Sequence, residues 1–282
     1  MTSAMVWLDS ELLPIEQARV SVLDRGLTVG DGVFETIKVV DGTPFALTRH
    51  LQRLQQSAAA LDITVPEVVP EAVQAVIHAN GFSADGNGRA GTIGRLRLTV
   101  THGDAVLGDP YAGSGEPRLF ITIVAQQPWP PTATVAQSRF TRNPGSALAG
   151  VKSTSYAENA IALREAKAVG ADEALLLTND GRISEGTGSN IFLGLAGRLV
   201  APSLASGCLA GITRALAIEW CGAAEVDLPA AALDEATEAF LTSSTRDIHP
   251  IANLAGRPLE TGPVTTRAMA IWNANAHADL DP

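Results

Sequence analysis

The sequence contains very little lysine. Only Lys38, Lys152 and Lys167 carry an amine, although lysine and arginine together number 20. An amine can lose its proton and attack a carbonyl carbon, whereas a guanidinium stays protonated. Lys152 stands just before a helical pattern. Taken alone, it is either a solvated residue near a helix start or a candidate nucleophile, and the rest of the sequence has to distinguish the two.

Cysteine is also scarce. Cys208 and Cys221 are the only two, and their spacing gives neither a disulfide framework nor the CxxC pair of a metal site. We therefore predict no bound metal. We also predict a protein of a reducing compartment, with a cytoplasmic location.

Long apolar runs and basic runs are both missing. The most apolar long window, residues 201–224, is interrupted by Arg214 and Glu219, which predicts no membrane span. The formal net charge is −10, which argues against a nucleic-acid surface. Asp9 and Glu11 near the beginning, without a basic region, predict no secretory signal.

The proline-rich stretch QQPWPP, residues 126–131, predicts a break between two halves. We expect a small N-terminal domain over residues 1–126, a linker over 127–133 and a larger cofactor-binding domain over 134–282. Strand patterns outnumber those of a simple alternating strand–helix order. The predicted fold class is therefore α+β, with two lobes.

Side-chain alternation predicts a strand from Phe34 to Val40, with Phe34, Thr36, Lys38 and Val40 on one face. The Asp41-Gly42 pair predicts the following hairpin turn. Thr48 is expected to cap a helix over residues 49–63.

Two pairs of arginines lie at spacings that place both members on one face. Arg49 and Arg53 are one helical turn apart, and they form either a solvated basic face or an anion clamp. Arg95 and Arg97 share one face of a predicted strand, which either binds a carboxylate or meets solvent.

Several segments suit a cofactor that carries an aldehyde, a ring nitrogen and a phosphate. Lys152 could bind the aldehyde, and Glu185 could pair with the ring nitrogen. The helix start at 211–213, the hydroxyls of 243–245 and Arg53 could bind the phosphate. Each feature also has an ordinary structural role, and spacing does not establish that they converge.

Seven segments, in order, resemble the class IV (fold-type IV) pyridoxal-phosphate enzymes. This family includes branched-chain and D-amino acid aminotransferases, (R)-selective amine aminotransferases and aminodeoxychorismate lyases. The segments are DRGLTVGDGVFETIKV (24–39), RHLQRLQQSA (49–58), RLRLTVTHG (95–103), VKSTSYAENAIALREA (151–166), GRISEGTGSNIF (181–192), AGITR (210–214) and TSSTRDIHPI (242–251).

The resemblance implies a role for individual residues. Lys152 matches the catalytic lysine that holds pyridoxal 5'-phosphate as a Schiff base. Glu185 matches the acid at the ring nitrogen. The remaining cofactor-binding positions are Arg53, Tyr156, Asn190, Ile212, Thr213 and Ser244, and the substrate-side positions are Phe34, Thr36, Lys38, Arg97 and Thr245.

The resemblance also implies a homodimer that acts on a small amino donor and a 2-oxo acid acceptor. The loop GDAVLGDPYAG (103–113) lacks the Arg-x-His carboxylate trap typical of D-amino acid enzymes, and FETIK (34–38) lacks the glycine of branched-chain enzymes. A carboxylate would therefore meet Lys38, Arg95, Arg97, His102 or Arg182. We expect a D-amino acid aminotransferase, with (R)-amines as a further candidate class of donor. The alternatives are an aminodeoxychorismate lyase and a non-catalytic cofactor-binding protein.

Overall fold

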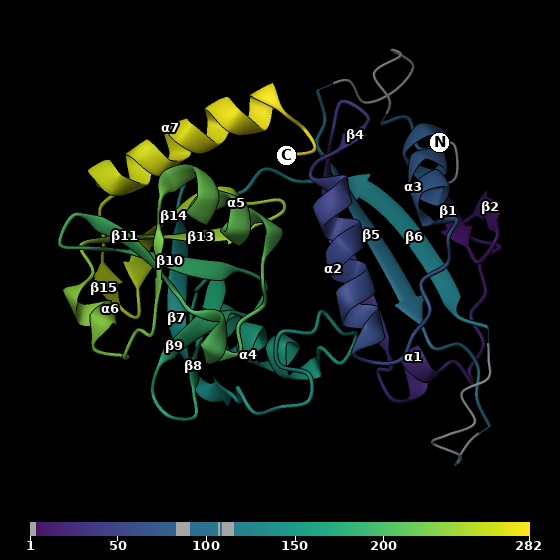
Figure 1. The fold of residues 1–282 in the computed structure, drawn as a ribbon, viewed down its shortest axis with the longest axis horizontal. Helices are drawn as coiled ribbons and strands as arrows, with labels where there is room; N and C mark the ends of the chain where they lie inside the picture. The colour runs from purple at the N-terminus through teal and green to yellow at the C-terminus, as the bar shows by residue number, and fades with distance from the viewer. Residues whose placement is uncertain (1–3, 83–90, 107, 109–115) are drawn as a thin grey trace. The chain divides into compact units, whose positions relative to one another are not determined.

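The computed structural model describes residues 4–82, 91–106, 108 and 116–282. The chain forms two compact units (Figure 1). Unit 1 consists of Met1–Gln127, Val151–Tyr156 and Leu280–Pro282, and unit 2 of Pro128–Gly150 and Ala157–Asp279. The segment that carries Lys152 thus belongs to unit 1. The division into a small domain at 1–126, a linker at 127–133 and a larger cofactor-binding domain at 134–282 stays a prediction.

Unit 1 is built on a six-stranded antiparallel sheet with the order β2-β1-β6-β5-β3-β4. Its strands are β1 (Met5–Leu8), β2 (Glu11–Pro14), β3 (Gly32–Val40), β4 (Thr43–Pro44), β5 (Gly94–Thr101) and β6 (Arg118–Ala125). Its helices are α1 (Arg25–Thr28), α2 (Leu47–Ala59) and α3 (Val69–Ala79).

One face of this sheet carries the core of unit 1. Val33, Ile37 and Val39 of β3 point to that face, because strand side chains alternate. They pack with apolar residues of β5 and β6 and with α2 and α3, which cover the same side of the sheet (Figure 1). The opposite face therefore carries the predicted set Phe34, Thr36 and Lys38.

The helix that carries Arg53 begins earlier than predicted, and the expected Thr48 cap is wrong. Helix α2 starts at Leu47, and its N-cap is Ala46, without a side-chain cap. Thr48 lies inside the first turn, where its N–H donates to Asp281 Oδ1 (2.9 Å). The Ala46 N–H donates to the Leu280 carbonyl (2.6 Å). Residues 280–282 thus supply the partners that a local cap would have supplied.

Unit 2 contains a nine-stranded mixed sheet with the order β12-β11-β10-β13-β14-β7-β8-β9, and β15 pairs with β14. The strands are β7 (Ala133–Arg142), β8 (Glu173–Thr178), β9 (Ile183–Gly186), β10 (Asn190–Leu195), β11 (Arg198–Pro202), β12 (Ala224–Val226), β13 (Glu238–Ser243), β14 (Asp247–Leu254) and β15 (Arg257–Pro258). The helices are α4 (Ala157–Ala168), η1 (Leu204–Ser206), α5 (Ile212–Cys221), α6 (Ala232–Glu235) and α7 (Pro263–Ala278).

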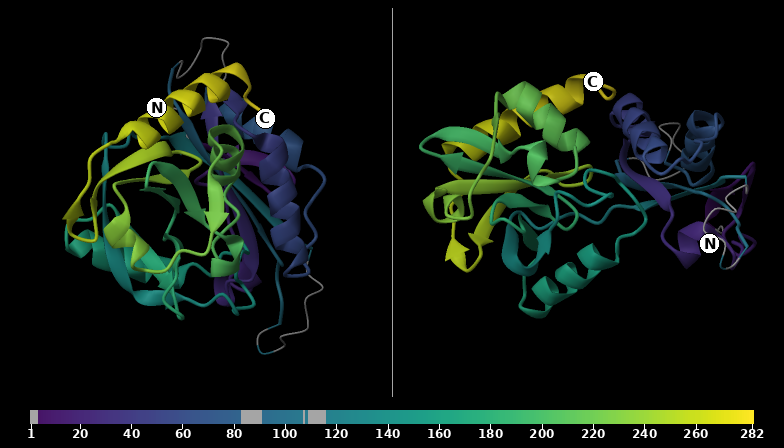
Figure 2. Two further views of the ribbon diagram at one scale, coloured as in Figure 1. Left: turned by 60° about the vertical axis from the view of Figure 1, so that its left-hand side comes forward. Right: turned by 60° about the horizontal axis from the view of Figure 1, so that its bottom comes forward.

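The strands of unit 2 curve around their own apolar core (Figure 2). Side chains such as Leu175, Ile191 and Leu241 lie fully buried there. Helices α5 and α7 contact each other and the β13–β14 side of the sheet, whereas α4 covers β7 and β8. The helices, the antiparallel sheet of unit 1 and the mixed sheet of unit 2 confirm the α+β class.

In the described part of the chain, every helix is too short or too polar to cross a bilayer. The same residues contain no group of three or more histidine, cysteine, aspartate or glutamate side chains placed to hold a metal ion.

Candidate active site

Lys152 is held by main-chain hydrogen bonds to β3. Its carbonyl accepts the Phe34 N–H at 2.9 Å, and Ser153 forms a bridge with Val33 next to it. The Lys152 N–H donates to Ser57 Oγ of α2 at 3.2 Å. The backbone of this lysine is thus fixed by a strand and a helix of unit 1. A group held in this way suits a role that needs accurate placement.

The amine of Lys152 lies against an aromatic ring that also carries a second cation. Lys152 Nζ is 4.3 Å from the centroid of the Phe34 ring, and Arg97 Cζ is 3.3 Å from the same centroid. Tyr156 meets Phe34 edge-on, with ring centroids 5.5 Å apart. Cations are attracted to the electron-rich face of an aromatic ring. Phe34 therefore brings four of the predicted site residues together.

The sheet face around Phe34 is basic. In the antiparallel register Thr36 lies opposite Arg97, and Lys38 opposite Arg95, so all four project from the same face. Lys38 is buried, and its Nζ lies 4.9 Å from the Phe45 ring. Burial lowers the pKa of the Arg97 guanidinium to about 10, so it still carries its charge at neutral pH.

Arg53 lies on the other side of β3, in the core-facing layer between the sheet and α2. Its Nε and Nη2 donate to the two carboxylate oxygens of Glu35, at 2.8 and 2.6 Å. Both side chains are buried. The structure thus places the predicted phosphate arginine in an ion pair that the sequence patterns did not indicate.

In unit 2, the predicted ring-nitrogen acid Glu185 is buried and held at both oxygens. Its Oε2 accepts the Leu209 N–H at 3.0 Å, and its Oε1 lies 3.2 Å from Arg142 Nη2. Both donors stabilise the carboxylate form. Arg142 also donates to Asn159 Oδ1 at 3.1 Å, which fixes the guanidinium against α4.

The turn that follows Glu185 is organised around a second buried carboxylate, Glu173 of β8. Its Oε1 accepts the Thr187 N–H (3.0 Å), and its Oε2 accepts the Ser189 hydroxyl (3.0 Å). This turn connects β9, which carries Glu185, to β10, which begins at Asn190. The bonds to Glu173 therefore set the position of both predicted site residues.

The N-terminus of α5 has no side-chain cap among the residues described, and its N-cap, Gly211, packs closely against Asn190. Asn190 Nδ2 donates to the Leu209 carbonyl at 2.9 Å. A Cβ atom on Gly211 would lie 2.1 Å from Asn190 Oδ1. The N–H groups of Ile212 and Thr213 point along a helix end, which favours an anion.

Ser244 and Thr245 lie in the turn between β13 and β14 and are half-buried. The next residue, Arg246, stacks on Trp129 with Cζ 3.9 Å from the ring centroid, and its Nη2 lies 3.7 Å from Glu173 Oε2. Arg246 thus links the β13–β14 turn, which carries Ser244 and Thr245, to the Glu173 carboxylate.

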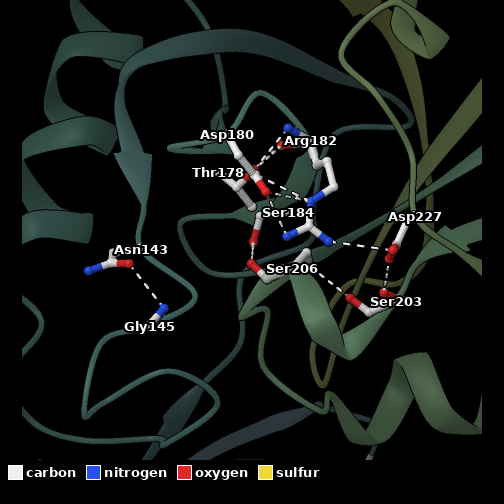
Figure 3. Close-up of polar contacts among 9 residues, drawn as sticks. All are labelled: Asn143, Gly145, Thr178, Asp180, Arg182, Ser184, Ser203, Ser206 and Asp227. Carbon is white, nitrogen blue, oxygen red and sulfur yellow. Dashed lines mark hydrogen bonds and ion pairs between the residues drawn. The ribbon is translucent and has the colours of Figure 1, made fainter.

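Two of the predicted basic candidates face carboxylates. Arg182 pairs with Asp180 at 3.0 Å and with Asp227 at 3.5 Å, and Asp227 also accepts the Ser203 hydroxyl (Figure 3). His102 Nδ1 lies 3.3 Å from Asp31 Oδ2. The charge of Arg182 is therefore balanced locally. The loop over residues 103–113 falls largely outside the described residues.

Sequence reasoning did not find Glu35, Arg142 or Glu173. A signal existed for Glu35, since it is the one charged residue on the apolar side of the alternating strand Val33–Val39. Glu173 gave a similar signal at the start of the apolar run EALLLT. Arg142 gave no signal, because its role depends on a contact with a distant loop.

Comparison with known proteins identifies the family. The family model described as "Amino-transferase class IV" matches residues 32–254. A putative branched-chain-amino-acid aminotransferase from Methanocaldococcus jannaschii is 33% identical over 281 residues, covering 93% of each chain. Other relatives carry the names aminodeoxychorismate lyase and D-alanine aminotransferase.

Solved structures of aminotransferases are also similar to this chain. A branched-chain aminotransferase from Thermoproteus uzoniensis superposes with a TM-score of 0.87 at 29% identity, covering 96% of this chain and 94% of that one. A fold IV-transaminase from Curtobacterium pusillum gives 0.82 at 32% identity, covering 94% and 92%. These matches confirm the predicted fold-type IV architecture.

The family uses pyridoxal 5'-phosphate, and the residues present fit it. Within unit 1, Lys152 is an amine with a fixed backbone and Arg53 is a buried arginine. Within unit 2, Glu185 is a carboxylate held by two donors, and Gly211 leaves no space for a side chain at the start of α5. An amine, an acid and an anion-binding helix end are the groups that this cofactor requires.

Gly211→Ala tests the packing of this helix end. We expect cofactor affinity to fall by about tenfold to a hundredfold, because the new methyl group displaces Asn190 or the helix start. The measurement is a titration of the apoenzyme with pyridoxal phosphate. Gly145→Ala is the control, since the nearest atom to its Cβ would lie 3.4 Å away.

The double variant Gly211→Ala/Asn190→Ala sharpens this test. Shortening Asn190 removes the clash, so the double variant should bind the cofactor no more weakly than Asn190→Ala alone. Independent, additive losses would contradict the packing argument.

Two buried histidines predict that the chain loses stability in mild acid. Burial lowers the pKa of His50 in unit 1 and of His249 in unit 2 below the ordinary value of 6.5. The unfolded chain therefore binds protons below about pH 6.5 that the folded chain does not bind, and the free energy of unfolding falls as pH drops. The loss is about 1.4 kcal/mol for each unit by which a pKa is lowered.

Denaturant unfolding between pH 7.5 and 5.5 measures this effect. His50→Asn keeps a donor at the position of Nδ1 but does not titrate, so it should reduce the pH dependence. His78→Asn, at an exposed position of α3, is the matched control. If the free energy of unfolding of His50→Asn falls with pH as steeply as that of the unchanged chain, the contribution assigned to His50 is contradicted.

Proposed function

Because the chain belongs to the class IV aminotransferases, we propose that it transfers an amino group between a D-amino acid and a 2-oxo acid, with pyridoxal phosphate as its cofactor. The observation that carries this proposal is the basic sheet face of unit 1. Arg97 lies there within 3.3 Å of the Phe34 ring, which Lys152 also contacts. A carboxylate-bearing substrate next to the amine would therefore meet a cation.

The residues divide the chemistry between them. The bound cofactor supplies an electron sink for the pair released when a substrate loses its α-proton. We assign the movement of that proton to Lys152 Nζ, because an unprotonated amine is a suitable general base. Glu185 would hold the ring nitrogen, with Tyr156 and Asn190 beside the cofactor. Arg53, Ile212, Thr213 and Ser244 would hold the phosphate.

Thr36 favours small substrates. Its branched side chain lies on the same face as Phe34 and Lys38, opposite Arg97. A glycine at this position would leave room for a branched substrate side chain, whereas threonine fills part of that space. This supports D-alanine and similar donors over branched-chain amino acids. Thr245, in the turn after β13, would contribute a hydroxyl on the substrate side.

The substrate carboxylate would be recognised by the sheet instead of a loop. The loop over residues 103–113 contains neither arginine nor histidine. Lys38, Arg95 and Arg97 project from one face of β3 and β5. An arginine can bind a carboxylate with two parallel hydrogen bonds, which makes Arg97 our first choice for this contact.

An exposed apolar surface supports a homodimer. Val22, Leu27 and Val29, around α1 of unit 1, are 77%, 66% and 61% exposed. Apolar side chains grouped in this way mark protein contacts more often than solvent surfaces. We expect sedimentation of the full chain at micromolar concentration to give twice the mass of 29.3 kDa. A single species at the monomer mass would contradict this expectation.

A cytoplasmic location is part of the proposal. Cys208 and Cys221 are both free thiols, which suits a reducing compartment.

A substrate panel tests the proposed activity. The holoenzyme is incubated with 2-oxoglutarate and either D-alanine, L-leucine or an (R)-arylalkylamine, and separately with aminodeoxychorismate. We expect D-glutamate from D-alanine to be the fastest product. Arg97→Met should raise the KM for D-alanine by about tenfold, because a hydrogen bond to a charged group is lost. Arg198→Met, at an exposed position of unit 2, is the control.

Three other outcomes separate the alternatives. L-glutamate from L-leucine without D-glutamate would identify a branched-chain enzyme, as the names of many relatives suggest for those proteins. Rapid 4-aminobenzoate without D-glutamate would identify a lyase. No amine-dependent change in absorbance near the visible edge, or a change that persists in Lys152→Ala, would contradict the assignment of Lys152.

A further inference from the structure

Glu35 is a charged residue in the core of unit 1. It lies on β3 between Val33 and Ile37, on the face covered by α2, and is completely buried. A carboxylate buried without partners is strongly unfavourable. Its position in an apolar strand face therefore has to be explained by the groups around it.

Two side chains of α2 surround this carboxylate. His50 Nδ1 lies 2.7 Å from Glu35 Oε2, while Arg53 donates through Nε to Oε1 and through Nη2 to Oε2. His50 and Arg53 are three positions apart, so one face of the helix presents both. All three side chains are buried. We call Glu35, His50 and Arg53 the buried triad.

The charges within the buried triad are defined by this geometry. Burial alone would raise the pKa of Glu35, but Arg53 and His50 hold it well below its ordinary value. Burial lowers the pKa of His50. The carboxylate can only accept, so a neutral His50 must carry its proton on Nδ1. The triad therefore contains one anion, one cation and one neutral donor.

The contacts also fix the orientation of the arginine. Glu35 takes the edge of the guanidinium formed by Nε and Nη2, and a planar guanidinium then presents Nη1 on its far side. A flexible arginine would lose side-chain freedom when it binds an anion. One already held by a buried carboxylate loses less.

The same two elements hold the catalytic lysine. Phe34, next to Glu35 on β3, donates its N–H to the Lys152 carbonyl, and Ser57, one turn beyond Arg53 on α2, accepts the Lys152 N–H. The buried triad joins β3 to α2, the same two elements that make these hydrogen bonds to Lys152. A shift of α2 along β3 would therefore displace both Arg53 and Lys152.

We propose that Glu35 is a positioning residue for cofactor binding: with His50 as its second donor, it orients Arg53 towards the phosphate of pyridoxal phosphate. This inference rests on the proposed function, because it takes Arg53 to be a phosphate ligand. It predicts that Glu35, which touches no part of the cofactor, controls affinity for the phosphate and not for the ring.

Binding of two forms of the cofactor to the apoenzyme tests this proposal. Dissociation constants are measured for pyridoxal phosphate and for pyridoxal, which lacks the phosphate. Glu35→Gln should weaken pyridoxal phosphate about tenfold, as expected when hydrogen bonds to a charged group are lost, and change pyridoxal less than about twofold. Glu67→Gln, an exposed position of unit 1, is the control.

Double variants connect the effect to the arginine. Arg53→Met should show the same preference for loss of phosphate affinity, and Glu35→Gln/Arg53→Met should bind no more weakly than Arg53→Met alone. If Arg53→Met weakens both ligands equally, Arg53 is not a phosphate ligand and that part of the proposed function fails. If Arg53→Met is selective but Glu35→Gln is not, the positioning role is overturned.

His50 provides the test if Glu35→Gln does not fold, as circular dichroism of the apoenzyme will show. His50→Asn retains a donor near the position of Nδ1, whereas His50→Leu removes it. We expect His50→Asn to bind pyridoxal phosphate within about twofold of the unchanged chain and His50→Leu to bind it several-fold more weakly, with pyridoxal unaffected in both. Equal affinities in the two variants, or equal losses for both ligands, would overturn the proposal.

Discussion

The position of Lys152 in unit 1 depends on the pairing of residues 152–154 with β3. The Lys152 carbonyl and Ser153 pair with Phe34 and Val33 at the end of β3 that β4 does not reach. Main-chain hydrogen bonds of this kind fix position without using any side chain. The backbone of Lys152 is therefore held by main-chain and hydroxyl partners and not by its own side chain.

The two faces of β3 carry different groups. The side chains of Phe34, Thr36 and Lys38 project to one face, where Arg97 and Arg95 make the surface basic. Glu35 projects to the other face and meets His50 and Arg53 of α2. Strand alternation thus separates the groups proposed for the substrate from those proposed for the phosphate. One strand organises both.

The sequence correctly predicted that Phe34, Thr36 and Lys38 share one face of β3, because period-two alternation is a local property. The chemistry of an amine and an acid made Lys152 and Glu185 candidates, and the family resemblance gave each a role. Neither source revealed the partners of Glu185, since Arg142 reaches it through folding and not through spacing. The predicted cap at Thr48 failed for the same reason. The partners at the start of α2 come from Asp281 and Leu280, which no local pattern connects to that helix.

This remote cap has a consequence for how the chain matures during synthesis. Thr48 and Asp281 are 233 positions apart, so the first turn of α2 obtains this partner only after residues 280–282 have been synthesised. The pairing of residues 152–154 with β3 also waits for the middle of the chain. Domains usually fold in order as they leave the ribosome. The helix that carries Arg53 is therefore synthesised long before residues 280–282, which complete its first turn.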